Sequence, residues 1–177
     1  IIVGEDWDTW SEHYKVPAEA FKSQSPRRFL PLEMILSTND PSVGPSVNSL
    51  SIEFEDALIK EAKGSILPLE ALPDEDTRFT YTLQSEAEEL DSGFDRLRFV
   101  LSESVETGSV EIEIGGQAVV PTSVQIQADS LLIDLPSPVR SDSVSISFTT
   151  RVIENATVFA LDLGLTERPG IWQSVEP

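Results

Sequence analysis

The chain has 177 residues, 31 of them acidic and 12 basic, so its net charge is −19, and 40% of the residues are apolar. That apolar share argues against wholesale disorder, and no run of about 18 apolar residues is present to cross a membrane. The negative surface repels phosphates and anionic lipid headgroups, so we expect neither nucleic-acid binding nor membrane insertion.

Cysteine is absent, and His13 is the single histidine. The missing thiols exclude disulfides, thiolate metal sites and cysteine nucleophiles. A Ser-His-Asp triad would depend on His13, and the sequence has no Gly-x-Ser-x-Gly, GxxxxGK[ST], GxGxxG or HExxH motif. We therefore expect that the protein is not an enzyme and has no cofactor. Ca²⁺ is the one ion that its acidic residues could bind.

The first third of the chain predicts two strands and two weakly helical stretches. Apolar residues alternate with others over Leu30–Leu36 and again over Leu50–Phe54, the period that indicates half-buried strands. The weakly helical stretches are Val16–Lys22 and Phe54–Lys63. The opening Ile1–Gly4 is too short for a signal peptide, so we expect a mature form or a fragment.

The remainder of the chain repeats the two-residue period many times. Alternation predicts strands at Phe79–Leu83, Leu97–Leu101, Val110–Ile114, Val124–Ile126, Leu131–Leu135 and Val144–Phe148. Gly115-Gly116 predicts a tight hairpin whose second arm contains Val119 and Val120, and Asp129-Ser130 predicts a second turn. The prolines of Pro136–Pro138 predict a break in the chain before the Val144 strand.

Around ten short strands at near-regular spacing indicate an all-β, antiparallel β-sandwich, either immunoglobulin-like or jelly-roll-like. A boundary is expected within residues 57–76, where the alternation stops and proline and acid follow. We expect the closing strands of a partial sandwich with a Trp-containing leading loop in residues 1–57, and a complete immunoglobulin-like sandwich in residues 58–177. The first part is too short to be expected to fold alone.

Strand and turn motifs in both parts resemble those of a known group of proteins. They are Trp7-x-x-Trp10, Ser25–Phe29, Leu36–Pro41 and Pro45–Val47 in the first part, and Gly93–Asp95, Gly115-Gly116, Asp129–Leu132, Leu135-Pro136 and Phe148-x-x-Arg151 in the second. Together they are similar to the β-sandwich and immunoglobulin-like modules of large secreted bacterial cell-surface proteins, mostly of unassigned function. The resemblance implies a fold and a location rather than an activity. Pro31 departs from that pattern and suggests an edge or a bulge.

Three aromatic residues near the start are the candidate ligand site. Trp7, Trp10 and Tyr14 could form a platform on which a sugar ring stacks, because indole faces pair with apolar sugar faces. The alternative is that the two tryptophans hold a long loop against the sheet. A binding role requires the rings to be exposed, whereas a structural role requires them to be buried.

Acidic clusters are the candidate metal ligands. Asp6, Asp8 and Asp40, with Glu12, could bind Ca²⁺, as could Asp74–Asp76, or Asp91 with Asp95. None has the spaced ligands of an EF-hand loop, and solvated turns are the alternative for each cluster. Asn155 begins the glycosylation sequon Asn155-Ala-Thr157.

Two classes of function remain. The first is a non-catalytic structural or assembly module of a secreted or cell-surface, filament-type bacterial protein, whose partners are neighbouring domains or subunits that bind through sheet edges. The second is a carbohydrate-binding module that binds a polysaccharide through the loop of Trp7, Trp10 and Tyr14.

Overall fold

A computed structural model of the chain describes residues 9–23, 29–40, 42–54, 56–153 and 157–176. The described residues form ten strands and no helix. The strands are β1 (Glu61–Leu67), β2 (Thr77–Glu86), β3 (Phe94–Val100), β4 (Glu111–Ile114), β5 (Gln117–Ala118), β6 (Ser123–Ile126), β7 (Ser130–Val139), β8 (Val144–Thr150), β9 (Ala160–Leu165) and β10 (Arg168–Ser174). Within these residues no helix is long and apolar enough to cross a membrane.

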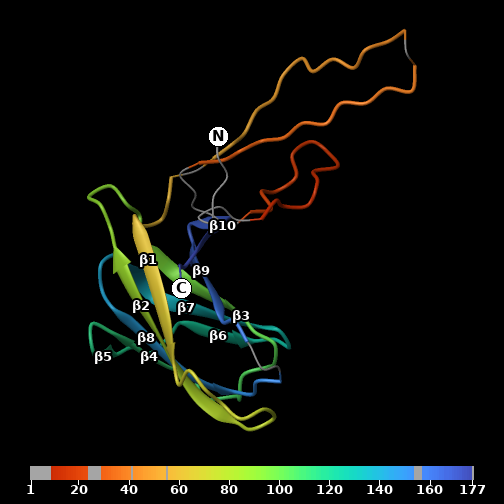
Figure 1. The fold of residues 1–177 in the computed structure, drawn as a ribbon. Coiled ribbons are helices and arrows are strands. Elements are labelled where there is room, and N and C mark those ends of the chain that lie inside the picture. Colours follow the sequence, from red (N-terminus) through yellow and green to blue (C-terminus); the bar gives the residue numbers. More distant parts are fainter. Residues whose placement is uncertain (1–8, 24–28, 41, 55, 154–156, 177) are drawn as a thin grey trace.

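The strands make two sheets of five strands each, and Figure 1 shows them below the residues that precede β1. The first sheet has the order β1-β2-β8-β4-β5, and the second has the order β10-β9-β3-β7-β6. Every strand pair within the sheets is antiparallel. The all-β, antiparallel sandwich predicted from the alternation is therefore confirmed.

The core lies between the sheets because the central strands β2, β3, β7 and β8 turn apolar residues inward. On β8 the apolar residues Val144, Ile146 and Phe148 are buried, as is Thr150, and the residues between them are only half-buried. Aromatic rings meet across the two layers: Phe99 of β3 lies 5.3 Å from Phe148 of β8 and 5.2 Å from Tyr81 of β2, measured between ring centroids. The period-two alternation of β2, β3, β7 and β8 thus predicted the inward faces correctly.

Both predicted hairpins are present. Ile114 pairs with Gln117, and the two residues between them, Gly115 and Gly116, have φ angles of 58° and 76°. A two-residue hairpin with both φ angles positive needs residues without a Cβ, which explains the glycine pair. Its second arm is β5, slightly earlier than Val119 and Val120. The second turn joins β6 to β7, where the Gln127 N–H donates to the Ser130 carbonyl at 2.9 Å.

Two predictions in the second part are wrong. Pro136–Pro138 do not end a strand, because β7 continues through them to Val139. The register between β3 and β7 shifts between Phe94 and Arg96, so the prolines occupy a bulge, where the missing N–H groups remove no ladder bond. The weakly helical stretch Phe54–Lys63 is not a helix, and β1 begins inside it at Glu61.

Three predictions in the first part are also wrong. Val16–Lys22 contains a turn at Val16–Ala18 instead of a helix. The alternating stretches Leu30–Leu36 and Leu50–Phe54 are not half-buried strands, and all of their residues except Pro31 are exposed. Alternation creates an apolar face, but a strand forms only where a neighbour offers backbone partners. Figure 1 shows this part of the chain, in orange, running away from the sandwich and returning to it.

Candidate interaction surface

Residues 29–54, here called the arm, carry most of the exposed apolar side chains that precede the sandwich. Those exposed are Phe29, Leu30, Leu32, Met34, Ile35, Leu36, Val43, Val47, Leu50, Ile52 and Phe54. The exposed fraction reaches 87% at Phe54. Single exposed apolar residues are ordinary on proteins, but a concentration of this kind usually marks a surface that another molecule covers.

The arm differs from the rest of the chain in charge as well. Its only ionisable residues are Glu33, Asp40 and Glu53, in a chain whose net charge is −19. Asp40 is used locally: its carboxylate accepts hydrogen bonds from the Ser42 N–H at 2.9 Å and the Ser42 hydroxyl at 2.6 Å. Both bonds lower the pKa of Asp40, and the bond from the Ser42 hydroxyl has the larger effect. The arm is therefore an apolar, weakly charged segment on an acidic protein.

The arm joins the sandwich at Leu58, where Gln173 of β10 holds the chain. Gln173 is buried, and its Oε1 accepts the Leu58 N–H at 2.8 Å and the Ile59 N–H at 3.2 Å. Its Nε2 donates to the Ile59 carbonyl at 2.8 Å. One side chain thus bonds the backbone of Leu58 and Ile59 in the way that a neighbouring strand would.

The backbone of Glu176 extends this closure. The Gly64 N–H donates to the Glu176 carbonyl at 2.7 Å, and the Glu176 N–H donates to the Ala62 carbonyl at 3.0 Å. These bonds form an isolated parallel bridge between Lys63 and Glu176. The last described residues therefore connect β10 of the second sheet to β1 of the first sheet. The arm departs from this closed side of the sandwich.

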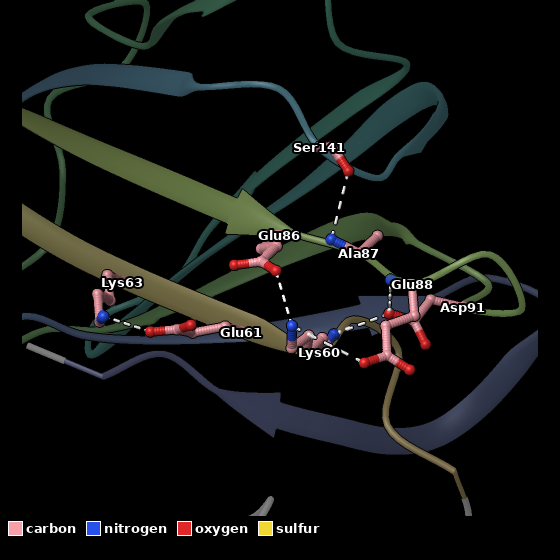
Figure 2. A network of polar contacts seen from close by, with 8 residues as sticks. All are labelled: Lys60, Glu61, Lys63, Glu86, Ala87, Glu88, Asp91 and Ser141. Atoms are coloured by element: carbon pink, nitrogen blue, oxygen red, sulfur yellow. Dashed lines mark hydrogen bonds and ion pairs between the residues drawn. The ribbon is translucent and has the colours of Figure 1, made fainter.

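Charged side chains on the surface fix the same junction, as Figure 2 shows. The Lys60 N–H donates to the Asp91 carboxylate at 2.8 Å, and the same oxygen accepts the Glu88 N–H at 2.7 Å. Lys60 Nζ lies 2.7 Å from Glu86 and 3.8 Å from Glu88, and the bond to Glu86 raises the pKa of Lys60. Such exposed pairs add little stability, but together they orient the chain that enters β1.

The predicted aromatic site is only partly within the described residues. Trp10 is 62% exposed and Tyr14 44% exposed, whereas Trp7 lies outside the described residues. The Tyr14 hydroxyl accepts the Lys22 N–H at 3.0 Å, and Lys22 Nζ lies 4.9 Å from the Tyr14 ring centroid. Phe21 lies 6.5 Å from the same ring, centroid to centroid. Tyr14 is thus engaged within its own loop, while Trp10 is open to solvent.

The predicted metal ligands lie only partly within the described residues. Asp6 and Asp8 lie outside the described residues, as does the sequon residue Asn155. Within the described part of the chain no group of three or more His, Cys, Asp or Glu residues could hold a metal ion.

The other acidic candidates serve the local structure. The Asp76 carboxylate accepts two hydrogen bonds from Arg151, at 2.6 and 3.1 Å, and Asp91 receives the two backbone N–H groups described above. Asp95 accepts the Thr166 N–H at 2.7 Å. The Arg151 bond lowers the pKa of Asp76. These carboxylates brace loops, which fits the solvated-turn alternative.

A stack on the outer face of the second sheet was not predicted. The Arg98 guanidinium lies 4.1 Å from the centroid of the Trp172 ring, and Arg98 is paired with Asp162 at 2.8 Å. The ring lies over Gly164, where an added Cβ would come within 2.7 Å of it. Arg98 is on β3, Asp162 on β9 and Trp172 on β10, so the ion pair and the stack together brace the β9–β10 edge against β3. The sequence gives no sign of it, since only the register places Trp172 opposite Gly164.

Comparison with known proteins gives little. No family model matches the chain, and no curated protein matches it. Among solved structures, the chain is similar to the crystal structure of a DUF4466 family protein from Parabacteroides merdae, with a TM-score of 0.43 and 13% identity. The match covers 67% of this chain and 44% of that chain, so the chain spans less than half of its length.

Proposed function

We propose that the protein is a non-catalytic assembly module, and that the arm is the part that binds a partner. The observation that carries this proposal is the exposure of the arm's alternating apolar residues, Leu50, Ile52 and Phe54 foremost. Burying one such side chain completely is worth about 1.5–3 kcal/mol, so three of them can offset much of the entropy lost on association. An extracellular location belongs to the same proposal and is supported by the resemblance to bacterial cell-surface modules.

The net charge decides the conditions under which assembly occurs. Copies with a charge of −19 repel one another at low ionic strength, and the repulsion is screened as salt rises. Sedimentation velocity over a range of salt and protein concentrations should therefore show association that grows with salt. A wild-type chain that stays monomeric under all these conditions would contradict the proposal.

A matched pair of variants separates the apolar face from charge alone. Leu50→Asp with Ile52→Asp adds two negative charges on the apolar positions of the arm. Ser49→Asp with Ser51→Asp adds the same charge on the polar positions that alternate with them. We expect the first variant to be monomeric at salt concentrations where the second still associates. Equal behaviour of the two would mean that the apolar face does not mediate assembly.

Carbohydrate binding remains the second candidate because Trp10 is exposed. A stacking platform for a sugar needs an open aromatic face, and Trp10 has one whereas Tyr14 is engaged by Lys22. Titration of soluble polysaccharides while tryptophan fluorescence is recorded would test this role. A saturable change that is lost in Trp10→Ala would support it.

A further inference from the structure

We infer that the partner of the arm is a second copy of this chain, and that Leu50–Phe54 of one copy adds as a strand to the open edge of β6 in the next. This inference rests on the proposed assembly function and names the surface that receives the arm. The two surfaces are matched in charge, in backbone geometry and in reach.

The charge pattern singles out both surfaces. The two longest stretches of the chain without Asp, Glu, Lys or Arg are residues 114–128 and 41–52. The first contains β5 and β6, and the second ends within the donor segment Leu50–Phe54 of the arm. When two acidic proteins associate, the contact that brings uncharged surfaces together avoids most of the repulsion. Natural edge strands usually carry a charged guard, and β6 has none.

The backbone of β6 is ready to receive a strand. β6 is the last strand of its sheet, with β7 on one side. Because Gln127 bonds to Ser130 across the turn, residues of the same parity, such as Gln125, bond to β7. Val124 and Ile126 therefore direct their N–H and C=O groups away from β7, toward the open side. Val124 and Val120 are 38% and 86% exposed, and an added apolar strand would cover them.

The arm offers the complementary strand. Leu50, Ile52 and Phe54 alternate with Ser51 and Glu53, so one face can continue the core while the other faces water. The other alternating stretch of the arm, Leu30–Leu36, is a poorer donor because Pro31 lacks an N–H group. Leu50–Phe54 has no proline.

The reach of the chain shows that the acceptor belongs to another copy. Phe54 is four residues from Leu58, which Gln173 holds beside β10, so the two are at most about 14 Å apart. The Leu58 carbonyl also accepts the Gly93 N–H at 2.9 Å, directly before the middle strand β3. The open side of β6 is three strand spacings from β3, about 14 Å, and β6 begins level with Arg96, about 10 Å farther along β3 than Gly93, so the distance to span is about 17 Å. Leu50–Phe54 therefore cannot lie along its own β6. Because the donor segment and the acceptor edge are different surfaces of the chain, the contact is head-to-tail and extends into a chain of copies or closes into a ring.

Proline variants at two of the edge strands, β6 and β1, test the acceptor. Val124→Pro removes an N–H that points away from β7, so the sandwich should stay folded while the edge is blocked. Ile66→Pro is the control on β1: the Gly64 N–H points away from β2 toward Glu176, so the Ile66 N–H does as well. We expect Val124→Pro to abolish association and Ile66→Pro to leave it intact, with thermal melts confirming that both fold. The reverse result would place the acceptor on β1 and overturn the inference.

A mixing experiment tests the head-to-tail geometry. The Leu50→Asp/Ile52→Asp copy has an intact β6 edge, and the Val124→Pro copy has an intact arm. Each should be monomeric alone, and the mixture should form a one-to-one heterodimer that does not grow further. If the wild type associates and the mixture stays monomeric, the inference is wrong while the assembly function stands.

A third measurement needs no variant. Hydrogen exchange of the wild type, followed by NMR at low and high salt, should show the amides of Val124 and Ile126 slowing by about tenfold or more on association. Association that leaves both amides exchanging at the monomer rate would also overturn the inference.

Discussion

The side-chain amide of Gln173 bonds to Leu58 as a neighbouring strand would: its Oε1 accepts the Leu58 N–H at 2.8 Å, although 115 positions separate the two residues. Gln173 is buried and also bonds the N–H and the carbonyl of Ile59. Replacing it therefore leaves three backbone polar groups without this hydrogen-bond partner. We expect Gln173→Ala to lower the free energy of unfolding by about 2–4 kcal/mol, as measured in urea. The neighbouring Ser174→Ala, which loses one bond to Asp162, should cost about 1 kcal/mol or less. Equal losses would contradict the role assigned to Gln173.

Phe148 is buried at the centre of the core, where its ring contacts those of Phe79 and Phe99. Phe148→Ala should lower the free energy of unfolding by about 3–5 kcal/mol. Ser147, the next residue, is half-buried, and its hydroxyl lies 2.9 Å from that of Thr80. Ser147→Ala should therefore cost at most about 1 kcal/mol. Comparable effects in chemical denaturation would refute the register of β8.

Gly64 leaves room for a ring of the adjacent strand, since an added Cβ would overlap the Tyr81 side chain. Gly64→Ala must displace that ring and should lower the free energy of unfolding by about 1–3 kcal/mol. Gly44→Ala, in the arm, meets no atom within 4 Å and should leave the thermal midpoint of the sandwich unchanged. A Gly64→Ala variant as stable as the wild type would show that Tyr81 can move without cost.

The carboxylate of Glu19 accepts the N–H groups of Lys15 and Val16 and pairs with Lys22. Chiefly through the bond to Lys22, its pKa is lowered from 4.5 to about 2. A lowered pKa means that the carboxylate stabilises the folded loop above pH 4.5, and that this contribution is lost as the pH falls toward 2. NMR titration of the Glu19 side chain should show the depressed midpoint, and Lys22→Met should move it back up. A midpoint that does not respond to Lys22→Met would contradict the assignment.

Folding should not depend on a metal ion, because the carboxylates of Asp76, Asp91 and Asp95 hold arginine or backbone partners. Thermal melts with EDTA and with added Ca²⁺ should agree to within about 2 °C. A midpoint that falls by tens of degrees in EDTA would instead indicate a structural Ca²⁺ site.

Sequence alone predicted those strands whose own residues alternate between apolar and polar. β2 and β8 alternate along their lengths and β3 alternates from Leu97 onward, and their inward residues are the buried ones. β1 was missed because its stability comes from other residues: Gly64 fits against Tyr81, and Glu176 bonds to its outer edge. The bulge at Pro136–Pro138 was predicted as a break because local propensity does not reveal that β3 pairs on both sides of it.

At the candidate interaction surface, the local sequence was not enough to predict the structure. Alternation in Leu50–Phe54 predicted a strand, and the pattern is real, but the described chain supplies no neighbour for it. Gln173 and Trp172 could not be singled out, because their roles depend on the long-range contacts to Leu58 and to Gly164. The alternation of residues predicts which face of a segment is apolar. It does not predict which other segment will pair with it, because that depends on the topology of the fold.

The attachment of the arm at Leu58 also determines how the sandwich would bear a mechanical load. Tension applied through the arm reaches the fold first at the Gln173 amide, then at the bridge between Lys63 and Glu176, and only then at the ladder of β1 and β2. The first of these links is the three hydrogen bonds that Gln173 makes to the backbone of Leu58 and Ile59, and the side chains of both residues belong to the buried core. A pulled module could therefore not release its junction without drawing Leu58 and Ile59 out of its hydrophobic interior, so the two would open together.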